Sequence, residues 1–402
     1  MHDPWAAFKD LRDHAPIVWD EVSQSWLVSR YEHLRPLLRG DQLSFEYSQE
    51  QVGVYFGDAP SMVAMEGKQH ARRRRLVNPF FHGAGLERFN ATIERRAHSF
   101  LDPIWERERA AVDAGQRARG RFDFVAEFSQ MYPVDVIADA MALPVRDYAK
   151  FREWYSAFLL CLANFTMDQT VIDNGLRAKR EFGDYVLPLI AQRRGSEDDD
   201  LISRLCRAEI DGERMSDEDI RTFLSLMLLA GGETTDHQLA LLMHELVQRP
   251  DLLQALAEDR GMMDAVLAEG MRFCAISRAI QREALSDIEL DGITIPAGAR
   301  VTLMLASANR DERRFERADE FIVERTDNTL SRAFTGNADH LGFGAGSHVC
   351  MGAHLALREM TTALNLVLDN TNDLRLAEDF EPRYEGLPIR SLPHLELTYA
   401  PV

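Results

Sequence analysis

The sequence predicts a mainly α protein with small β-sheets, an α+β fold formed by a single large domain over residues 1–402. Three observations predict it. From about residue 86 to 280 the apolar positions follow a helical period, broken by Gly, Pro or charge clusters. Strand-forming residues concentrate at roughly 16–60 and 286–306, with a further strand signal at 387–399. No linker, low-complexity tract or internal repeat divides the chain.

Residues 16–30 predict a short β-hairpin near the amino terminus. Trp19, Val22, Trp26 and Val28 supply strand-forming side chains around a polar turn.

A long helix is predicted to begin at the capping box Ser216-x-x-Asp219. The charged run at 193–200, some way before it, predicts a solvated loop. Behind the box, four residues recur at helical spacing and share one face: Phe223, Met227, Ala230 and Thr234.

Composition excludes several classes of partner. The formal charge of -19 argues against nucleic acid or an anionic membrane surface. The four cysteines are far apart and form no CxxC pattern, which disfavours a disulfide framework or a zinc knuckle. The most apolar stretches are shorter than the roughly 18 residues that a membrane span needs. Because the amino terminus also lacks the layout of a signal peptide, we expect a cytoplasmic protein.

The most informative segment is the loop over residues 343–352. Nearby glycines let its backbone turn tightly and approach a flat ligand closely. An amphipathic helix follows Cys350, and the amides and dipole of a helix start favour a thiolate over a thiol. A free cysteine titrates near ~8.5, so such stabilisation is needed for an anionic ligand at neutral pH. The alternative is a buried cysteine in a Gly-rich turn.

This loop matches the pattern F-G-x-G-x-H-x-C-x-G at all its fixed positions and resembles the haem-binding signature of the cytochrome P450 family. The resemblance implies a P450 fold in which haem b is buried between a long central helix and the cysteine loop. It implies that Cys350 is the axial ligand of the iron, a thiolate that favours O–O cleavage. Phe343 would shield the sulfur, His348 would reach a propionate, and two glycines would contact the haem: Gly344 and Gly352.

The oxygen-activating motif of the family is similar to residues 230–235, Ala-Gly-Gly-Glu-Thr-Thr. Two glycines weaken a helix by about 1 kcal/mol each, so either the helix opens there or something packs against its backbone. The resemblance implies that Thr234 is the hydroxyl near bound oxygen, that Glu233 relays protons, and that Ala230 and Gly231 contact the haem. The alternative is a helix kink with a Thr capping a carbonyl.

Glu269-x-x-Arg272 resembles a structural motif of the family, because the run that follows it resembles the family's small sheet and meander. The same spacing occurs at Glu106-x-x-Arg109 and Glu218-x-x-Arg221, which we interpret as helix-surface pairs. Arg325 would complete a network with Glu269 and Arg272. Buried ions persist only when paired, so this trio is assigned to structure.

Four donors are predicted to bind the two haem propionates. His70 and Arg74 are four residues apart and share one helical face. By the resemblance, Arg282 and His348 supply the others. Three more arginines on the same helix form a basic cluster, Arg72, Arg73 and Arg75, which we hypothesise docks an acidic ferredoxin.

The family topology implies a mostly apolar substrate site. Its segments include 157–166 and 387–392, and the individual candidates are Val63, Met65, Phe223, Met227, Ala275, Ile276, Ser277 and Ile389. Each is equally plausible as a core residue. Arg278 and Arg390 have two interpretations, a partner for a substrate carboxylate or a surface arginine. The chain lacks the proline that many relatives carry soon after Arg272, so the path of that loop is open.

The resemblance implies a monooxygenase that inserts one oxygen atom from O2 into a small, largely hydrophobic or aromatic substrate, by hydroxylation or oxidative dealkylation. Electrons would come from NAD(P)H through a separate ferredoxin and reductase, because no such segment is fused here. Two alternatives are a peroxide-driven haem-thiolate oxygenase and a non-enzymatic haem sensor or carrier. The Glu233–Thr234 pair argues against both, since neither needs a proton relay.

Overall fold

The computed structural model describes residues 4–46, 49, 53–162, 164, 168–386 and 389–401. Its contacts divide the chain into two compact units. Unit 1 consists of Met1–Ser44, Ala97–Gln130 and Thr235–Val402, and unit 2 of Phe45–Arg96 and Met131–Thr234. Two long helices have residues in both units, α6 (Asn90–Asp113) and α11 (Asp217–Val247). The mainly α architecture with small sheets confirms the predicted fold class.

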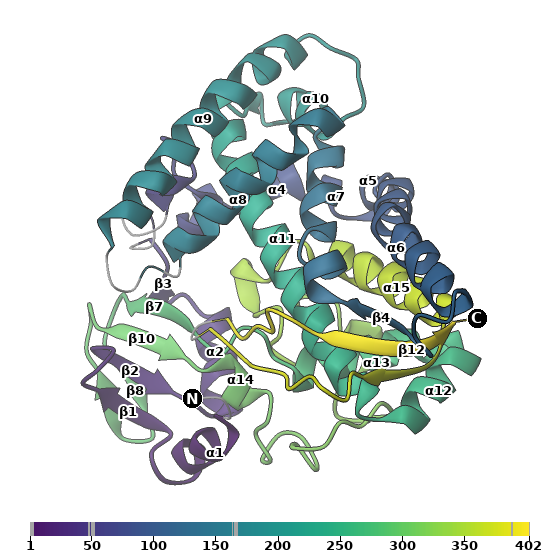
Figure 1. Cartoon of the computed structure of the whole chain (residues 1–402). Coiled ribbons are helices and arrows are strands. Elements are labelled where there is room, and N and C mark those ends of the chain that lie inside the picture. Colours follow the sequence, from purple (N-terminus) through teal and green to yellow (C-terminus); the bar gives the residue numbers. More distant parts are fainter. Residues whose placement is uncertain are drawn as a thin grey trace. The chain divides into compact units, whose positions relative to one another are not determined.

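A five-stranded sheet lies in unit 1 and joins strands of residues 17–44 to strands of residues 280–303 (Figure 1). Its order is β1-β2-β10-β7-β3, so the purple amino-terminal strands lie beside the green strands of residues 280–303. Strand β10 runs parallel to β2, and the other neighbours are antiparallel. The bounds are β1 Ile17–Asp20, β2 Ser25–Val28, β3 Leu43–Ser44, β7 Ile280–Ala284 and β10 Arg300–Leu303.

The core of this sheet is closed by two helices, α2 (Tyr31–Arg39) and α14 (Leu305–Ala308). Tyr31, Leu34 and Leu37 recur every three residues, so they share one face of α2, and that face is buried. They belong to one hydrophobic cluster with strand residues such as Val28 and Val301. Burial of this apolar face explains why a helix forms inside the 16–60 range, which the sequence assigned to β structure.

Unit 1 also contains two smaller groups of strands and several helices. A second sheet has the order β11-β12-β4, and β8 pairs with β9 as a hairpin. The bounds are α1 Trp5–His14, β4 Gly120–Asp123, α12 Pro250–Glu258, α13 Met263–Phe273, β8 Ile288–Leu290, β9 Ile293–Ile295, α15 Ala353–Asn370, β11 Thr371–Leu376 and β12 Glu396–Pro401.

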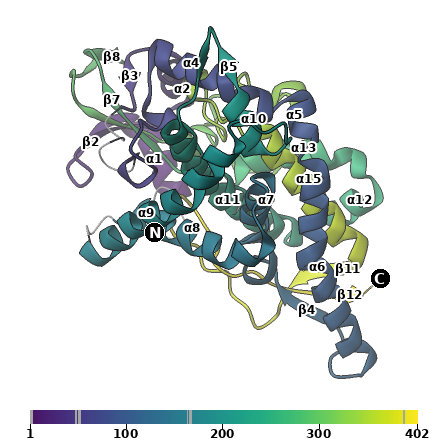
Figure 2. The ribbon, with the colours of Figure 1, turned by 90° about the horizontal axis from the view of Figure 1, so that it is seen from above.

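Unit 2 is almost entirely helical. Helices α8 (Tyr148–Leu162) and α9 (Gln169–Arg193) lie side by side in both views (Figures 1 and 2). Aromatic rings fill their contact, with Phe182 of α9 set edge-on against Trp154 at 5.5 Å. The remaining elements are α4 Gly67–Val77, α5 Gly83–Glu87, α7 Tyr132–Ala140, α10 Leu201–Arg207, β5 Glu209–Ile210 and β6 Glu213–Arg214.

Several local predictions hold. The amino-terminal hairpin pairs Trp19 with Trp26 across β1 and β2. The capping box forms with both bonds, since Asp219 N–H donates to Ser216 Oγ and Ser216 N–H donates to the Asp219 carboxylate, each at 3.0 Å. The strands β4, β5 and β6 are departures, because they interrupt the range 86–280 that was expected to be helical. Within the described ranges, every helix is too short or too polar to cross a bilayer.

Candidate functional site

The loop before α15 closes on itself around Cys350. The Cys350 N–H donates to the Phe343 carbonyl at 2.9 Å, and the Gly344 N–H donates to the Leu341 carbonyl at 2.9 Å. Helix α15 begins at Ala353 with Gly352 as its N-cap residue, so Cys350 directly precedes the first turn. Cys350 is exposed, whereas the other three cysteines are buried. The structure therefore presents one accessible thiol, at a helix start.

Two glycines give the cysteine loop its shape. Gly344 and Gly346 have φ angles of 71° and 74°, in the left-handed region that favours glycine. A Cβ on Gly346 would lie 2.9 Å from the Arg39 Cα of α2, so no other residue fits there. A Cβ on Gly344 would meet nothing within 4 Å. The loop is pinned to α2 on one side and borders open space on the other.

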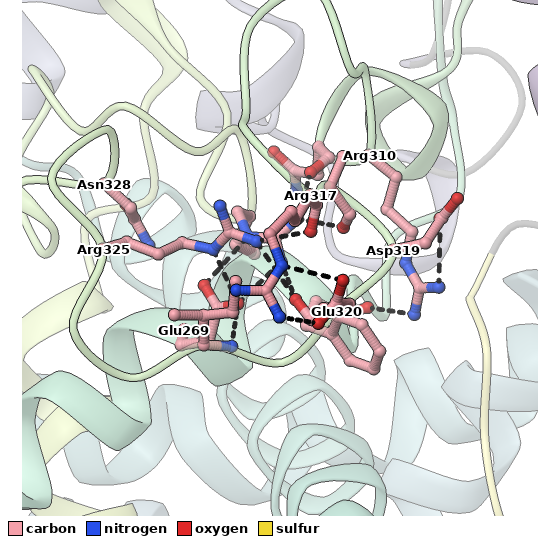
Figure 3. A network of polar contacts seen from close by, with 12 residues as sticks. Glu269, Arg310, Arg317, Asp319, Glu320, Arg325 and Asn328 are labelled. Carbon is pink, nitrogen blue, oxygen red and sulfur yellow. Dashed lines mark hydrogen bonds and ion pairs between the residues drawn. The ribbon is translucent and has the colours of Figure 1, made fainter.

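The predicted trio of Glu269, Arg272 and Arg325 forms a buried network in unit 1 (Figure 3). Arg272 donates to both carboxylate oxygens of Glu269, at 2.6 and 2.9 Å, and Arg325 Nε donates to one of them at 2.9 Å. The side chains of Glu269 and Arg272 are 2% and 0% exposed. Figure 3 shows Arg325 pointing toward Glu269 from the meander. A bidentate pair with its remaining N–H groups satisfied is the arrangement in which a buried ion pair is tolerated.

This network reaches the cysteine loop through Asn309. Arg272 Nη1 donates to the Asn309 carbonyl at 2.9 Å and to the Ala318 carbonyl at 2.7 Å. The Asn309 side-chain oxygen accepts from the Leu341 N–H at 2.6 Å, and Leu341 in turn accepts from Gly344. A short chain of hydrogen bonds therefore connects α13 to the loop that carries Cys350.

Thr234 lies on α11, which is a continuous helix from Asp217 to Val247. Its hydroxyl donates to the Ala230 carbonyl at 2.8 Å, the local bond that the alternative interpretation expected. The hydroxyl oxygen retains lone pairs that can accept a further hydrogen bond. The neighbouring Glu233 is buried.

The paired glycines of α11 allow close packing against its backbone. A Cβ on Gly232 would lie 2.8 Å from Val134 of α7 and 2.9 Å from Tyr155 of α8. A Cβ on Gly231 would lie 3.2 Å from Ile137 of α7. Of the two explanations for these glycines, opening of the helix or close packing, the structure of unit 2 displays the second.

Sequence analysis does not single out two buried acids, Glu359 on α15 and Asp236 on α11. Glu359 on α15 is fully buried, and burial raises its pKa well above the usual range although a hydrogen bond from Thr235 opposes the shift. Asp236 accepts a 2.5 Å hydrogen bond from Ser129. The signal for Glu359 was available, since it occupies an apolar face of an amphipathic helix. Its helix was interpreted only as the continuation of the cysteine loop.

The predicted propionate donors lie on three elements. His70, which is buried, and Arg74 lie on α4 of unit 2. Arg282 lies on β7, and His348 ends the 3-10 turn Gly346–His348, both in unit 1.

The basic cluster on α4 is matched by acids of unit 2. Arg72 pairs with Glu213 at 2.8 Å, Arg73 with Asp219 at 2.6 Å and Arg75 with Asp211 at 3.5 Å. These acids come from the β5–β6 hairpin and the first turn of α11. Each positive charge in the cluster therefore already has a partner within the chain, which the sequence did not indicate.

The predicted substrate residues are mostly buried and apolar. Met65, Phe223, Met227, Ala275 and Ile276 are each less than 9% exposed, and Val63, Ser277 and Ile389 are partly buried. Ser277 and Ile389 form an isolated β-bridge, which brings two of the predicted segments together. Of the segments 157–166 and 387–392, residues Ala163, Phe165, Thr166, Leu387 and Pro388 lie outside the described residues.

A model of the cytochrome P450 family matches residues 13–373. The chain belongs to the cytochrome P450 family. Among curated relatives of this P450, pulcherriminic acid synthase of Bacillus subtilis (strain 168) is 31% identical over 390 residues, covering 97% of this chain and 93% of that protein. Cytochrome P450 monooxygenase PikC of Streptomyces venezuelae is 30% identical, covering 93% and 85%. The protein is therefore a P450 monooxygenase, an enzyme class that uses haem and O2.

Solved P450 structures have the same fold. CYP109E1 from Bacillus megaterium, in complex with testosterone, superimposes with a TM-score of 0.85 at 26% identity and covers 99% of both chains. P450BioI in complex with an acyl carrier protein carrying hexadec-9Z-enoic acid has a TM-score of 0.85 at 25% identity, covering 99% and 98%.

The residues of this P450 fit the haem that the family uses. Cys350 is exposed, and no atom lies within 4 Å of the Cβ position of Gly344 in the same loop, so this side of the loop is open to a ligand. The Cβ position of Gly352 is 3.9 Å from the Cys350 sulfur, an ordinary van der Waals contact, so Gly352 lies next to the proposed ligand atom. An accessible soft ligand in a glycine-lined loop is the donor that haem-thiolate chemistry requires.

The loop after α13 contains one position that proline could not occupy. Ala275, in the loop after α13, has a φ of 41°. Proline is locked near ~-65°, so it cannot occupy this position in the observed backbone. Ala is costly in this region, by about 1–2 kcal/mol, and the surrounding contacts must hold it. The Arg390 N–H, which donates to the Ile276 carbonyl at 2.7 Å, is one of them.

The buried ion pair gives a stability prediction. Glu269→Gln removes the charge that two buried arginines share, so we expect the free energy of unfolding to fall by about 3–5 kcal/mol. The matched control is Glu106→Gln, which changes the same motif at an exposed site and should cost less than about 0.5 kcal/mol. Urea unfolding followed by circular dichroism measures both. Equal losses in the two variants would contradict the assignment.

The α11 glycines give a second prediction. Gly232→Ala places a methyl group against two side chains at under 3 Å, so we expect about 1–3 kcal/mol of destabilisation despite the better helix propensity of Ala. Gly231→Ala meets only the flexible end of Ile137, so it should be nearly neutral. Urea unfolding compares the two variants. If Gly231→Ala lost more stability than Gly232→Ala, close packing would not explain the two glycines.

Proposed function

We propose that this P450 inserts one oxygen atom from O2 into a small, largely hydrophobic or aromatic organic substrate, by hydroxylation or oxidative dealkylation. NAD(P)H would supply electrons through a separate ferredoxin and reductase. The observation that carries the proposal is the exposed Cys350 in a loop that matches the family signature, preceding a helix. Bound haem supplies the oxygen activation and the transfer of the oxygen atom to carbon.

The proposed role of Cys350 is to hold the iron as a thiolate. A thiolate needs stabilisation, and the unsatisfied N–H groups and dipole of the first turn of α15 favour negative charge beside it. The hydrogen bond from the Cys350 N–H to the Phe343 carbonyl fixes the backbone at the ligand. Phe343, Gly344 and Gly352 are proposed to contact the haem around the sulfur. The chain of hydrogen bonds from Arg272 through Asn309 supports this geometry.

The proposed role of His70, Arg74, Arg282 and His348 is to bind the two propionates. Two N–H donor side chains for each carboxylate match the hydrogen-bonding capacity of the group. Ala230 and Gly231 are proposed to lie against the haem on the oxygen-binding side. Their small side chains leave the helix backbone accessible there.

Glu233 and Thr234 are proposed to deliver protons. The Thr234 hydroxyl is oriented by its bond to the Ala230 carbonyl, so its lone pairs are free to accept a hydrogen bond from a water or from the reacting group. Glu233 is a buried acidic residue that directly precedes Thr234, and it is proposed to pass protons to the Thr234 hydroxyl. A peroxide-driven enzyme or a haem carrier would not need this pair.

The proposed substrate is apolar because of the residues assigned to its site. Val63, Met65, Phe223, Met227 and Ile276 are hydrophobic, and Ile389 adds a further aliphatic group. One relative is named for pulcherriminic acid and the structure of another contains testosterone, so membership of the family alone does not select a substrate.

Thr234→Ala tests the monooxygenase function. With a surrogate ferredoxin, a reductase and a ligand that shifts the ferric spin state, we expect NAD(P)H consumption to continue while product per NAD(P)H falls about tenfold or more. The diverted electrons should appear as H2O2. Thr234→Ser keeps the hydroxyl and is expected to retain most of the coupling.

Two outcomes would refute the proposed monooxygenase function. If the Ala variant kept wild-type coupling, Thr234 would not handle protons. If the wild type turned over with H2O2 alone but not with O2 and the electron donors, the peroxide-driven alternative would replace the proposal.

We also propose that an acidic ferredoxin docks beside α4. The side chains of Arg72 and Arg75 are 34% and 60% exposed, so they remain available to a partner, whereas Arg73 is largely covered together with Asp219. Because all three are paired within the chain, the local field is weaker than a free cluster would produce. For a ferredoxin to bind Arg72 and Arg75, the ion pairs of these arginines with Glu213 and Asp211 would have to break.

The double variant Arg72→Glu, Arg75→Glu tests this surface. We expect the ferredoxin-dependent reduction rate to fall about tenfold or more at low salt and to lose most of its salt dependence. Arg146→Glu is the control, since Arg146 is 83% exposed on a different element and should leave the rate unchanged. Unchanged rates in the double variant would place docking elsewhere.

A further inference from the structure

Two arginines are buried together in unit 1, where the loop after α13 meets the segment before β12. The side chains of Arg278 and Arg390 are 6% and 5% exposed. The two segments are joined by the Ser277–Ile389 bridge and by the hydrogen bond from the Arg390 N–H to the Ile276 carbonyl. The Arg278 carbonyl accepts from the Ala306 N–H at 3.2 Å, so its backbone is held on the other side as well. Arg278 and Arg390 are both buried, so the interpretation of each as a surface arginine is wrong.

Neither guanidinium has an acidic partner among the described residues. No ion pair or side-chain hydrogen bond joins Arg278 or Arg390 to a carboxylate in that part of the chain, and the Nε of each is buried without an acceptor. Other buried arginines differ. Arg12 is 1% exposed and pairs with Glu312 at 2.9 Å, and Arg272 pairs with Glu269. Among the buried arginines that the structure describes, a guanidinium without an acidic partner is therefore the exception.

Aromatic contacts offset part of the cost of burying the charge of Arg390, and the structure describes no such contact for Arg278. Arg390 stacks over the ring of Tyr384 at 3.9 Å and lies 5.5 Å from the ring of Trp5. Stacking covers the face of a guanidinium. Arg390 also makes a side-chain hydrogen bond with Tyr384, whereas its Nε has no acceptor. The acid to be considered as a partner of Arg390 is Glu245, because its charge acts on Tyr384. Glu245 already forms an ion pair with Arg249 at 2.7 Å.

The two like charges oppose one another. Burial lowers the pKa of Arg278, and the positive charge of Arg390 lowers it further. Burying charge without a partner is unfavourable unless a counter-ion joins it. A carboxylate has two oxygens, and each guanidinium can donate paired N–H groups to them. Two arginines side by side therefore offer enough donors for one carboxylate.

We propose that Arg278 and Arg390 form an oxyanion site that binds a carboxylate. The carboxylate has two possible sources, the organic substrate itself or a free small anion. The substrate source rests on the proposed function, because Ile276, Ser277 and Ile389, which neighbour the two arginines in the chain, were assigned to the substrate site. The free-anion source is independent of that function. The haem propionates have four other donors, and the experiments use haem-loaded protein, in which both propionates are already in place.

The first arm of the test is thermal unfolding of the haem-loaded enzyme in sodium acetate and in sodium chloride at equal ionic strength. If a free anion binds, acetate raises the melting temperature of the wild type above that in chloride, in a saturable manner. Arg278→Met and Arg390→Met should abolish this difference. Without acetate, Arg278→Met should be as stable as the wild type or more stable, because it removes an unpaired buried charge at similar volume.

The second arm follows the ferric spin state with 4-phenylbutyrate and its methyl ester, which share an apolar body. If the carboxylate belongs to the substrate, the acid should bind about tenfold or more tightly than the ester, and Arg278→Met should remove that preference. Equal affinities together with stabilisation by acetate would assign the site to a free anion.

Arg12→Met is the matched control for both arms. It removes a buried but paired arginine, so it should lower the melting temperature in any anion while leaving the acetate response and the acid preference intact. The proposal is overturned if acetate and chloride act alike and acid and ester bind alike. It is overturned equally if Arg278→Met destabilises the enzyme as Arg12→Met does and keeps the anion response. The thermal arm needs no turnover, so its failure is separate from failure of the proposed function.

Discussion

The buried pair of Glu269 and Arg272 is the interaction on which the rest of the structure depends. Two ions that are almost completely removed from water can remain only if every donor finds an acceptor, and here the acceptors are carbonyls of the meander together with the carboxylate. The pair therefore determines the path of a segment that has no regular secondary structure of its own. Through Asn309 that segment supports the loop that presents Cys350.

Glycine supplies the second constraint, at places where backbone must lie close to a neighbour. Gly346 sits against α2, and Gly232 sits against the side chains of α7 and α8. At Gly344 the same residue type has the opposite consequence, because it leaves space beside the thiol. The protein thus positions its reactive loop and its central helix by exclusion of side chains, and the space at Gly344 lies in the loop that carries Cys350.

Sequence patterns predicted the features that are local. The hairpin, the capping box and the Glu269–Arg272 spacing depend on residues within a few positions of one another, so periodicity and motif were sufficient. Features that depend on residues distant in the chain were not visible. The acids that pair with Arg72 and Arg75 follow about 140 positions later, on a hairpin that the helical pattern concealed, and burial of Arg278 requires the segment around Arg390. The left-handed conformation of Ala275 was not visible in the sequence, because the absence of a proline after Arg272 does not specify a backbone angle.

The most direct measurement of the central claim, that Cys350 binds the haem iron as a thiolate, is the absorption spectrum of the haem-loaded, reduced protein under carbon monoxide. The wild type is predicted to show the strongly red-shifted band of a thiolate ligand, and Cys350→Ala should lose that band. Cys274→Ala, which removes a fully buried thiol, should keep it. A wild-type spectrum without the shift, or an unchanged band in Cys350→Ala, would contradict the account.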